Sequence, residues 1–325
     1  GYTSAVGDYE ARRAISDDLN ARYGAATKPE EFFLGCGAAP ELVSVFRALA
    51  VPGGELLTVA PYFPEYKPFS EEAGLIFKVV PPDVPDFQIN LEALTAMLTP
   101  ATQAVLLNSP NNPSGVVYTR QTLEALAAIL RKKAAAFGHP IYLISDEPYR
   151  ELVYGVEVPY LPAIYPDTIV CYSYSKSLSL PGERIGYVLV PGSCADSQMV
   201  YAAVAGAARS CGHVCAPSLW QKVIARCAHL RPDLVSYDRN RQALYQGLTA
   251  MGYKMAKPDG AFYLFIQAPG GDANKFSDLA KRENLLLVPG DGFGCPGYFR
   301  ICYCVSYDMI QKSLPVFEKL IKQFP

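Results

Sequence analysis

The feature that most constrains the fold is a series of short apolar runs, each followed by polar residues, with a long amphipathic stretch between the first two. Three such runs cover residues 103–107, 141–144 and 168–172. Between the first two, residues 119–137 place apolar side chains at helical spacing. Strands that alternate with helices build a mainly parallel sheet with helices on both faces, and ligands collect at the carboxyl ends of its strands. The pattern therefore predicts an α/β protein with a site at that edge.

The length of the chain allows a second, smaller domain. The chain has 325 residues and half of them are hydrophobic, which is ample for a large core. A helix predicted over residues 235–251 leads into strands predicted over 261–267 and 298–303. We expect a large domain over residues 1–235, which includes a short N-terminal arm, and a small α+β domain over residues 236–325.

A lysine and an arginine follow the third apolar run. Ser173, Ser175 and Lys176 come directly after it, and Arg184 lies eight residues beyond the lysine. A lysine amine attacks carbonyls only if burial or a nearby cation lowers its pKa. The arginine and the two serines also form a plausible cradle for a phosphate. A ligand with both an aldehyde and a phosphate is pyridoxal phosphate, although a surface turn rich in Ser and Lys remains an alternative at this point.

Polar residues after the other two runs suit the ring of the same cofactor. Pyridoxal phosphate needs a carboxylate that keeps its ring nitrogen protonated, because the charged ring is the electron sink. Asp146, at the end of the second run, suits this task. Asn112 and Tyr149 suit a second task, which is to donate to the ring oxygen beside the aldehyde.

Together these stretches resemble the aspartate aminotransferase family, the class I/II aminotransferases of the fold-type I pyridoxal-phosphate enzymes. The resemblance runs from Tyr2 to about Arg300. It implies catalytic roles for Lys176, Asp146 and Tyr149, with Lys176 forming a Schiff base to pyridoxal 5'-phosphate. The further cofactor contacts that it implies are the ring-oxygen ligand Asn112 and the phosphate ligands Ser173, Ser175 and Arg184.

Two further segments are candidates for cofactor binding. Gly37, Ala38 and Ala39 lie at a predicted strand-to-helix turn, where small residues and the helix N-terminus favour an anion, so their backbone is a candidate for the phosphate site. In the family that the chain resembles, an aromatic residue after the strand predicted here over residues 56–60 covers the pyridine ring, and we assign that role to Phe63. Tyr62 and Tyr66 compete for it, and a core position for Phe63 remains an alternative.

The two ends of the chain carry the remaining site candidates. Arg300 lies in an apolar strand, where a charge needs a partner. In the family that the chain resembles, an arginine at this position binds the substrate α-carboxylate, so the resemblance implies this role for Arg300. The alternative is a structural ion pair. We also expect Asn112 to contact substrate. By resemblance, Tyr2 reaches the cofactor phosphate of a neighbouring subunit in a homodimer with shared active sites, unless it is a frayed terminal residue. Family members begin with a further segment, so we expect residues to precede Gly1.

The predicted function is amino-group transfer from an amino acid, with aspartate favoured, to a 2-oxo acid such as 2-oxoglutarate. Arg209 is a candidate for binding a distal carboxylate from the partner subunit, although an exposed helix arginine is the more ordinary interpretation. The alternatives are a β-eliminating C–S lyase with the same cofactor, a ligand-sensing regulator with an aminotransferase-like domain, and a cofactor-free binding protein.

Charge and composition argue against other classes of partner. The net charge is −2, from 29 basic and 31 acidic residues, so we expect neither nucleic acid nor an anionic membrane as partner. We see no apolar run long enough to span a membrane. Nine scattered cysteines suggest reduced thiols and a cytoplasmic location. Three separated histidines give no metal-ligand spacing, so we expect no metal.

Overall fold

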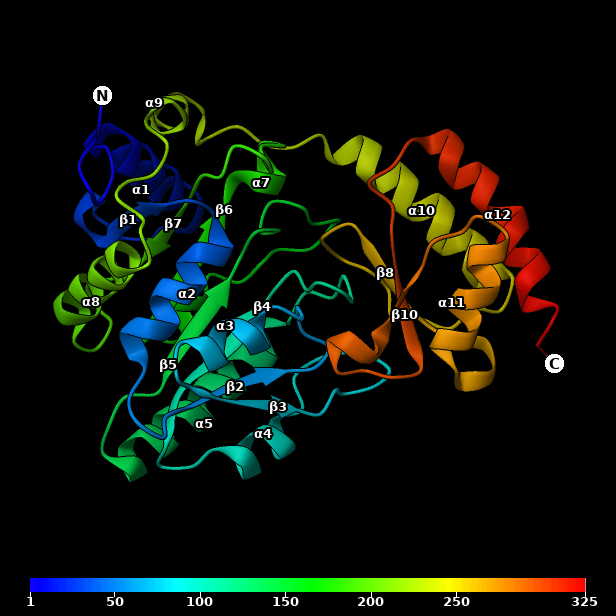
Figure 1. The fold of residues 1–325 in the computed structure, drawn as a ribbon, viewed down its shortest axis with the longest axis horizontal. Helices are drawn as coiled ribbons and strands as arrows, with labels where there is room; N and C mark the ends of the chain where they lie inside the picture. The colour runs from blue at the N-terminus through cyan, green and yellow to red at the C-terminus, as the bar shows by residue number, and fades with distance from the viewer. Residues whose placement is uncertain (325) are drawn as a thin grey trace.

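A seven-stranded sheet forms the centre of the larger part of the molecule in the computed structural model, which describes residues 1–324 (Figure 1). The strand order is β1-β7-β6-β5-β4-β2-β3. Strand β7 runs antiparallel to both of its neighbours, and the other pairs are parallel. The strands are β1 (Phe32–Gly35), β2 (Glu55–Val59), β3 (Ile76–Val80), β4 (Thr102–Asn108), β5 (Tyr142–Asp146), β6 (Thr168–Ser173) and β7 (Gly186–Leu189).

Helices cover both faces of this sheet because its central strands are apolar on both sides. Leu106 packs in a cluster with residues of α2 and α8, whereas its neighbour Leu107 packs in a separate cluster with residues of α4 and α5. Successive side chains of a strand point to opposite faces, so a continuous apolar run requires two covering layers. The helices of this part are α1 (Tyr9–Tyr23), α2 (Ala38–Leu49), α3 (Tyr66–Glu72), α4 (Leu91–Met97), α5 (Arg120–Phe137), α6 (Leu161–Ile164), α7 (Tyr174–Ser177), α8 (Ser197–Ser210) and α9 (Ser218–Cys227).

Local sequence sets the ends of the long helix α5. The Thr119 hydroxyl accepts a hydrogen bond from the backbone N–H of Thr122, which caps the first turn. Gly138 ends the helix in the left-handed conformation that glycine adopts most easily. The helix predicted over residues 119–137 is thus confirmed to within one residue.

A second, antiparallel sheet lies in the smaller part, at the right of Figure 1. Its order is β8-β10-β9, and three long helices pack beside it around Phe276, Phe299 and Phe317. The elements are β8 (Tyr263–Gln267), β9 (Val288–Pro289), β10 (Tyr298–Cys302), α10 (Leu234–Ala250), α11 (Ala273–Arg282) and α12 (Tyr307–Ile321). The chain enters this part between α9 and α10, and the predicted domain boundary at residue 235 stays a prediction.

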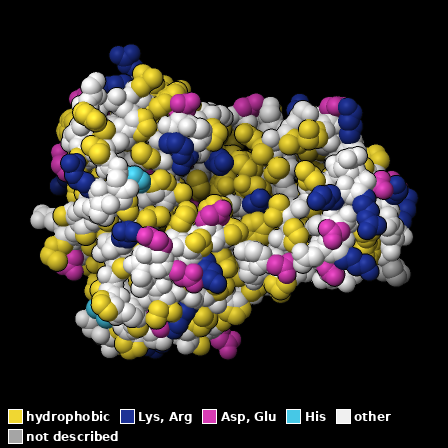
Figure 2. All heavy atoms as spheres, viewed as in Figure 1, with side chains coloured by type: hydrophobic (Ala, Val, Ile, Leu, Met, Phe, Trp, Pro, Cys, Tyr) yellow, Lys and Arg dark blue, Asp and Glu magenta, His cyan; other side chains and the backbone are white. Residues whose placement is uncertain are grey.

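The two sheets confirm the expected mixed architecture, a mostly parallel sheet flanked by helices with a smaller α+β part. Figure 2 shows hydrophobic side chains gathered at the hollow between the two parts. Within residues 1–324, each helix is too short or too polar to cross a membrane.

Candidate active site

The predicted site residues meet where the parallel strands end. In the strand register, Asn108 at the end of β4 lies beside Asp146 at the end of β5, which lies beside Cys171 of β6. A pocket of about 350 Å³ opens beyond these ends. The predicted residues that line it are Ala38, Ala39, Phe63, Asn112, Asp146, Tyr149, Ser173, Ser175, Lys176, Arg184 and Arg300.

Asp146 is buried at the floor of this pocket with one oxygen bonded and one free. The Tyr66 hydroxyl donates a 2.5 Å hydrogen bond to Oδ2, and Nδ2 of Asn108 lies 3.4 Å from the same atom. The other oxygen, Oδ1, is buried and has no hydrogen-bond partner among residues 1–324. Burial raises the pKa of Asp146 to about 7, and the bond from Tyr66 opposes this rise. A buried polar atom needs a partner, so Oδ1 is suited to a donor on a ligand.

Lys176 lies on the short helix α7, directly after β6. The Ser173 hydroxyl accepts from the backbone N–H of Ser175 and caps this helix. The lysine is half-buried, and its Nζ lies 5.4 Å from the centre of the Phe262 ring. Burial lowers the pKa of the Lys176 amine, and the positive charge of Arg184 acts in the same direction. The predicted cause, partial burial with a nearby cation, therefore operates here, with burial as the larger effect.

Hydroxyl groups, a guanidinium and a helix N-terminus converge beside the lysine. Ser173 Oγ and Ser175 Oγ lie 2.6 Å apart, and Arg184 Nη1 donates to Ser175 Oγ at 3.4 Å. Gly37 precedes α2 with φ of +94°, and a Cβ there would lie 2.5 Å from Nη2 of Arg184. Glycine at this position thus allows the guanidinium to approach the start of α2. This donor set suits a phosphate.

Part of the pocket lining joins the two parts of the molecule, because Arg300 and Tyr263 come from the smaller sheet. Arg300, from β10, donates to Oδ1 of Asn112 at 2.8 Å. Its guanidinium carbon lies 4.7 Å from the Tyr263 ring centre and 4.9 Å from that of Phe293. The hydroxyls of Tyr149 and Tyr263 are 3.1 Å apart. Arg300 has no carboxylate within salt-bridge distance among residues 1–324, which favours a ligand over the structural ion pair.

The aromatic residues after β2 separate into different environments. Phe63 lines the pocket, whereas Tyr66 is fully buried beneath Asp146. Tyr62 packs edge-on against Phe77. Of the three competing aromatics, Phe63 is the one that lines the pocket, and its stacking role stays a prediction.

Three predicted residues lie outside the pocket lining. Gly37 contacts it through Arg184. Tyr2 is 90 % exposed and borders a separate surface depression, so within one chain it does not reach the pocket. Arg209 is exposed at the end of α8. The roles predicted for Tyr2 and Arg209 require a second subunit and stay predictions.

Sequence reasoning missed Asn108 and Tyr263 as parts of the site, and it considered Tyr66 only as a competitor of Phe63 for the stacking role. Asn108 is the last residue of β4, so the strand-end argument applied to Asp146 would have found it. Tyr263 had no comparable signal, and neither did the hydrogen bond of Tyr66 to Asp146, because a tyrosine among apolar neighbours is typical of core.

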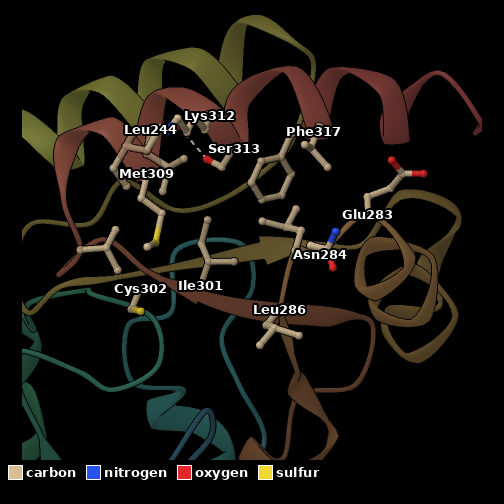
Figure 3. Close-up of a pocket in the computed structure, with 14 residues that line it drawn as sticks. Leu244, Glu283, Asn284, Leu286, Ile301, Cys302, Met309, Lys312, Ser313 and Phe317 are labelled. Atoms are coloured by element: carbon tan, nitrogen blue, oxygen red, sulfur yellow. Dashed lines mark hydrogen bonds between the residues drawn. The ribbon is translucent and has the colours of Figure 1, made fainter.

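A second cavity, of about 430 Å³, lies wholly within the smaller part (Figure 3). Its wall comes largely from apolar side chains of β10 and α12, including Ile301, Met309 and Phe317. It shares no lining residue with the pocket at the strand ends. In residues 1–324 no cluster of His, Cys, Asp and Glu could hold a metal ion.

The comparisons with known proteins agree with the class that this fold and pocket define. The family model described as aminotransferase class I and II matches residues 1–315. The chain belongs to this family and is an aminotransferase, an enzyme that moves an amino group between an amino acid and a 2-oxo acid. The family is known to use pyridoxal phosphate. The resemblance, the fold and the enzyme class expected from the sequence are confirmed, and the lyase and regulator alternatives are not favoured.

Individual relatives are similar over nearly the whole chain. An aspartate aminotransferase of Thermotoga maritima is 31 % identical over 98 % of this chain and 83 % of its own length. The crystal structure of an amino transferase from Eubacterium rectale has a TM-score of 0.98 at 51 % identity and covers 100 % of this chain and 82 % of its own. An aromatic aminotransferase from Pyrococcus horikoshii has a TM-score of 0.90 at 27 % identity, covering 99 % of this chain and 88 % of its own.

Proposed function

We propose that this aminotransferase binds pyridoxal 5'-phosphate in the pocket at the strand ends and acts through Lys176. The observation that carries the proposal is the free oxygen of a buried carboxylate, Asp146 Oδ1. It lies in the same pocket as a half-buried lysine and the hydrogen-bond donors of Ser175 and Arg184. When bound, the cofactor supplies an electron sink for the carbanion of an amino acid. The residues of the chain supply binding, orientation and proton transfer.

Three groups of residues would hold the cofactor. Asp146 would accept a hydrogen bond from the ring nitrogen and favour its protonated form. Asn112 and Tyr149 would contact the ring oxygen, and Phe63 would lie against the ring. The phosphate ligands would be Ser173, Ser175, Arg184 and the backbone of Gly37, Ala38 and Ala39.

Lys176 would be the covalent attachment point and the base. Its lowered pKa increases the share of neutral amine at neutral pH, and a neutral amine can remove the proton from the α-carbon of the substrate. Arg300 would hold the substrate α-carboxylate through its two parallel N–H donors, with Asn112 beside it. This pairing would fix the α-carbon relative to the lysine.

A homodimer would complete the site. Tyr2 is exposed at the N-terminal end of the described chain, where a neighbouring subunit could place it against the cofactor phosphate. We also propose the large domain over residues 1–235 and the small domain over residues 236–325 as the two bodies that carry the cofactor and the substrate arginine. A cytoplasmic location stays a prediction.

The substrate class is proposed from the relatives and from one arginine. The T. maritima relative is named an aspartate aminotransferase, and we infer aspartate as donor and 2-oxoglutarate as acceptor. Arg209 of a partner would bind the distal carboxylate. Transamination rates with aspartate, alanine and phenylalanine test this inference. Arg209→Ala should lower the rate with aspartate and leave the rate with alanine unchanged. A strong preference of the unsubstituted enzyme for phenylalanine would refute aspartate as the donor.

The cofactor proposal is tested by absorbance and turnover. Purified protein incubated with pyridoxal phosphate should absorb in the near-visible range, and Lys176→Ala should lose both this absorbance and aminotransferase turnover. Lys132→Ala, which removes a lysine from the exposed side of α5, is the matched control and should keep both. A Lys176→Ala variant that retained absorbance and turnover would contradict the assignment.

A further inference from the structure

Tyr66 occupies a position that the proposed chemistry has not used. Its side chain is fully buried at the start of α3, and its hydroxyl donates to Oδ2 of Asp146 at 2.5 Å. Its ring meets the ring of Phe63 edge-on, with centroids 5.6 Å apart. Packing therefore holds the phenol against Oδ2 of the carboxylate and leaves Oδ1 without a partner among residues 1–324.

A phenol suits this position because it donates without carrying charge. A lysine or arginine bonded to Oδ2 would neutralise the carboxylate and weaken its attraction for a second cation. A hydroxyl stabilises the carboxylate through one short bond and leaves its negative charge for Oδ1. Burial and the adjacent charge of Asp146 raise the pKa of Tyr66 well above its ordinary value, so the phenol keeps its proton.

We propose that Tyr66 is the positioning residue that holds Asp146 ionised, with Oδ1 directed to the protonated ring nitrogen of the cofactor. The proposal rests on the proposed function, since it assumes that the ring occupies this pocket. Asn108 gives Oδ2 only a longer contact of 3.4 Å. Without the phenol, the buried carboxylate would have one weak donor at Oδ2 and would bind a proton more readily.

Other groups around Asp146 act against ionisation and do not replace Tyr66. The negative charge of Glu147, the next residue in the chain, raises the pKa of Asp146. The remaining ionisable groups that interact with it are Glu41 of α2, Cys171 of β6 and Tyr149 of the following turn. Each of these is neutral or negative, so Tyr66 is the strong donor to this carboxylate among the described residues.

Binding of pyridoxamine phosphate tests the proposal without requiring catalysis. This probe has the same ring and phosphate but no aldehyde, so its affinity does not depend on covalent attachment to Lys176. Tyr66→Phe removes only the hydroxyl. Tyr118→Phe is the matched control, because Tyr118 is also buried near Tyr66 but does not hydrogen bond to Asp146 in the described part of the chain.

We expect Tyr66→Phe to weaken binding roughly tenfold or more, the range for losing a hydrogen bond to a charged group, and Tyr118→Phe to change it less than about twofold. The pH below which affinity falls should move upward in Tyr66→Phe, a shift that a merely structural role would not produce. In an Asp146→Asn background, Tyr66→Phe should have little further effect.

The outcomes separate this proposal from the proposed function. If the unsubstituted protein binds pyridoxamine phosphate and Tyr66→Phe binds it equally well with the same pH profile, the role of Tyr66 is wrong and the cofactor proposal stands. An equal loss in Tyr118→Phe would also overturn the role. Failure of the unsubstituted protein to bind the probe would overturn both.

Discussion

Replacing Arg300 by lysine separates charge from geometry at the end of the pocket proposed to bind the substrate. The guanidinium of Arg300 lies against the rings of Tyr263 and Phe293 and donates a hydrogen bond to Asn112. A guanidinium in this setting can give a carboxylate two parallel hydrogen bonds, each worth about 1.5 to 3 kcal/mol because both partners are charged. Lysine keeps the charge and one bond but loses the second bond and the stacking.

The loss of one such bond sets the expected size of the effect. Because about 1.4 kcal/mol corresponds to a tenfold change, Arg300→Lys should lower kcat/KM for amino acids by roughly 10- to 150-fold. Arg300→Met loses both bonds and the charge, so its loss should exceed roughly 150-fold. Affinity for pyridoxamine phosphate should not change in either variant.

Steady-state kinetics with two substrates provide the assay. Reaction with a primary amine that lacks a carboxylate should be nearly the same in Arg300→Lys and the unsubstituted enzyme. Arg239→Lys is the matched control, since Arg239 also stacks on a tyrosine of the smaller part, 4.6 Å from the Tyr307 ring centre, but is exposed. The reasoning is refuted if Arg300→Lys leaves kcat/KM for amino acids unchanged, or if the amine loses as much as the amino acid.

Two further substitutions test the proposed phosphate site, formed by Ser173, Ser175 and Arg184, and the buried carboxylate. Gly37→Ala should weaken cofactor binding at least about tenfold, because the new Cβ would displace Arg184. The control is Gly24→Ala, which is also at positive φ but has open space around its Cβ; it should cost only about 1 kcal/mol of stability and leave binding unchanged. Equal losses of binding in the two variants would contradict the proposed phosphate site. The pKa of Asp146 rises from 3.8 to about 7 on folding, so the folded cofactor-free protein binds the extra proton and loses stability as pH rises through this window. Asp146 should contribute a loss of about 2 to 3 kcal/mol between about pH 5 and pH 8 in chemical denaturation. The buried carboxyls of Glu41 and Glu147 also have raised pKa values and add to the loss, so Asp146→Asn should lessen the pH dependence by about the Asp146 share without abolishing it; an unchanged pH dependence in that variant would refute the assignment.

The sequence predicted the site best where chemistry and chain position coincide. Asp146 and Lys176 follow apolar runs directly, and parallel strands bring such positions to one edge, so their proximity followed from the pattern alone. Arg300 could be singled out because a charge in an apolar strand requires an explanation. Helix α5 was predicted to within one residue, because its ends, Thr119 and Gly138, are residue types that commonly cap helices.

Contacts that depend on tertiary packing could not be predicted. The bond from Tyr66 to Asp146 joins residues separated by 80 positions, and a buried tyrosine has the same sequence appearance with or without a polar partner. Tyr263 is similar, because its position between Tyr149 and Arg300 depends on how the smaller sheet packs against the larger one. The short strand β9, Val288–Pro289, is formed by two residues and lies below the length at which alternation can be recognised.

The hydrogen bond from Arg300 to Asn112 connects the part of the molecule built on the seven-stranded sheet to the part built on the three-stranded sheet, and this has a consequence for how the enzyme can diversify. In the proposed assignment, the contacts to the cofactor ring come from side chains at the strand ends of the larger sheet, whereas the contact to the amino acid comes from Arg300 on a strand of the smaller sheet. Substitutions that tilt or shift that strand can therefore alter which amino acids are accepted while the reaction itself is preserved.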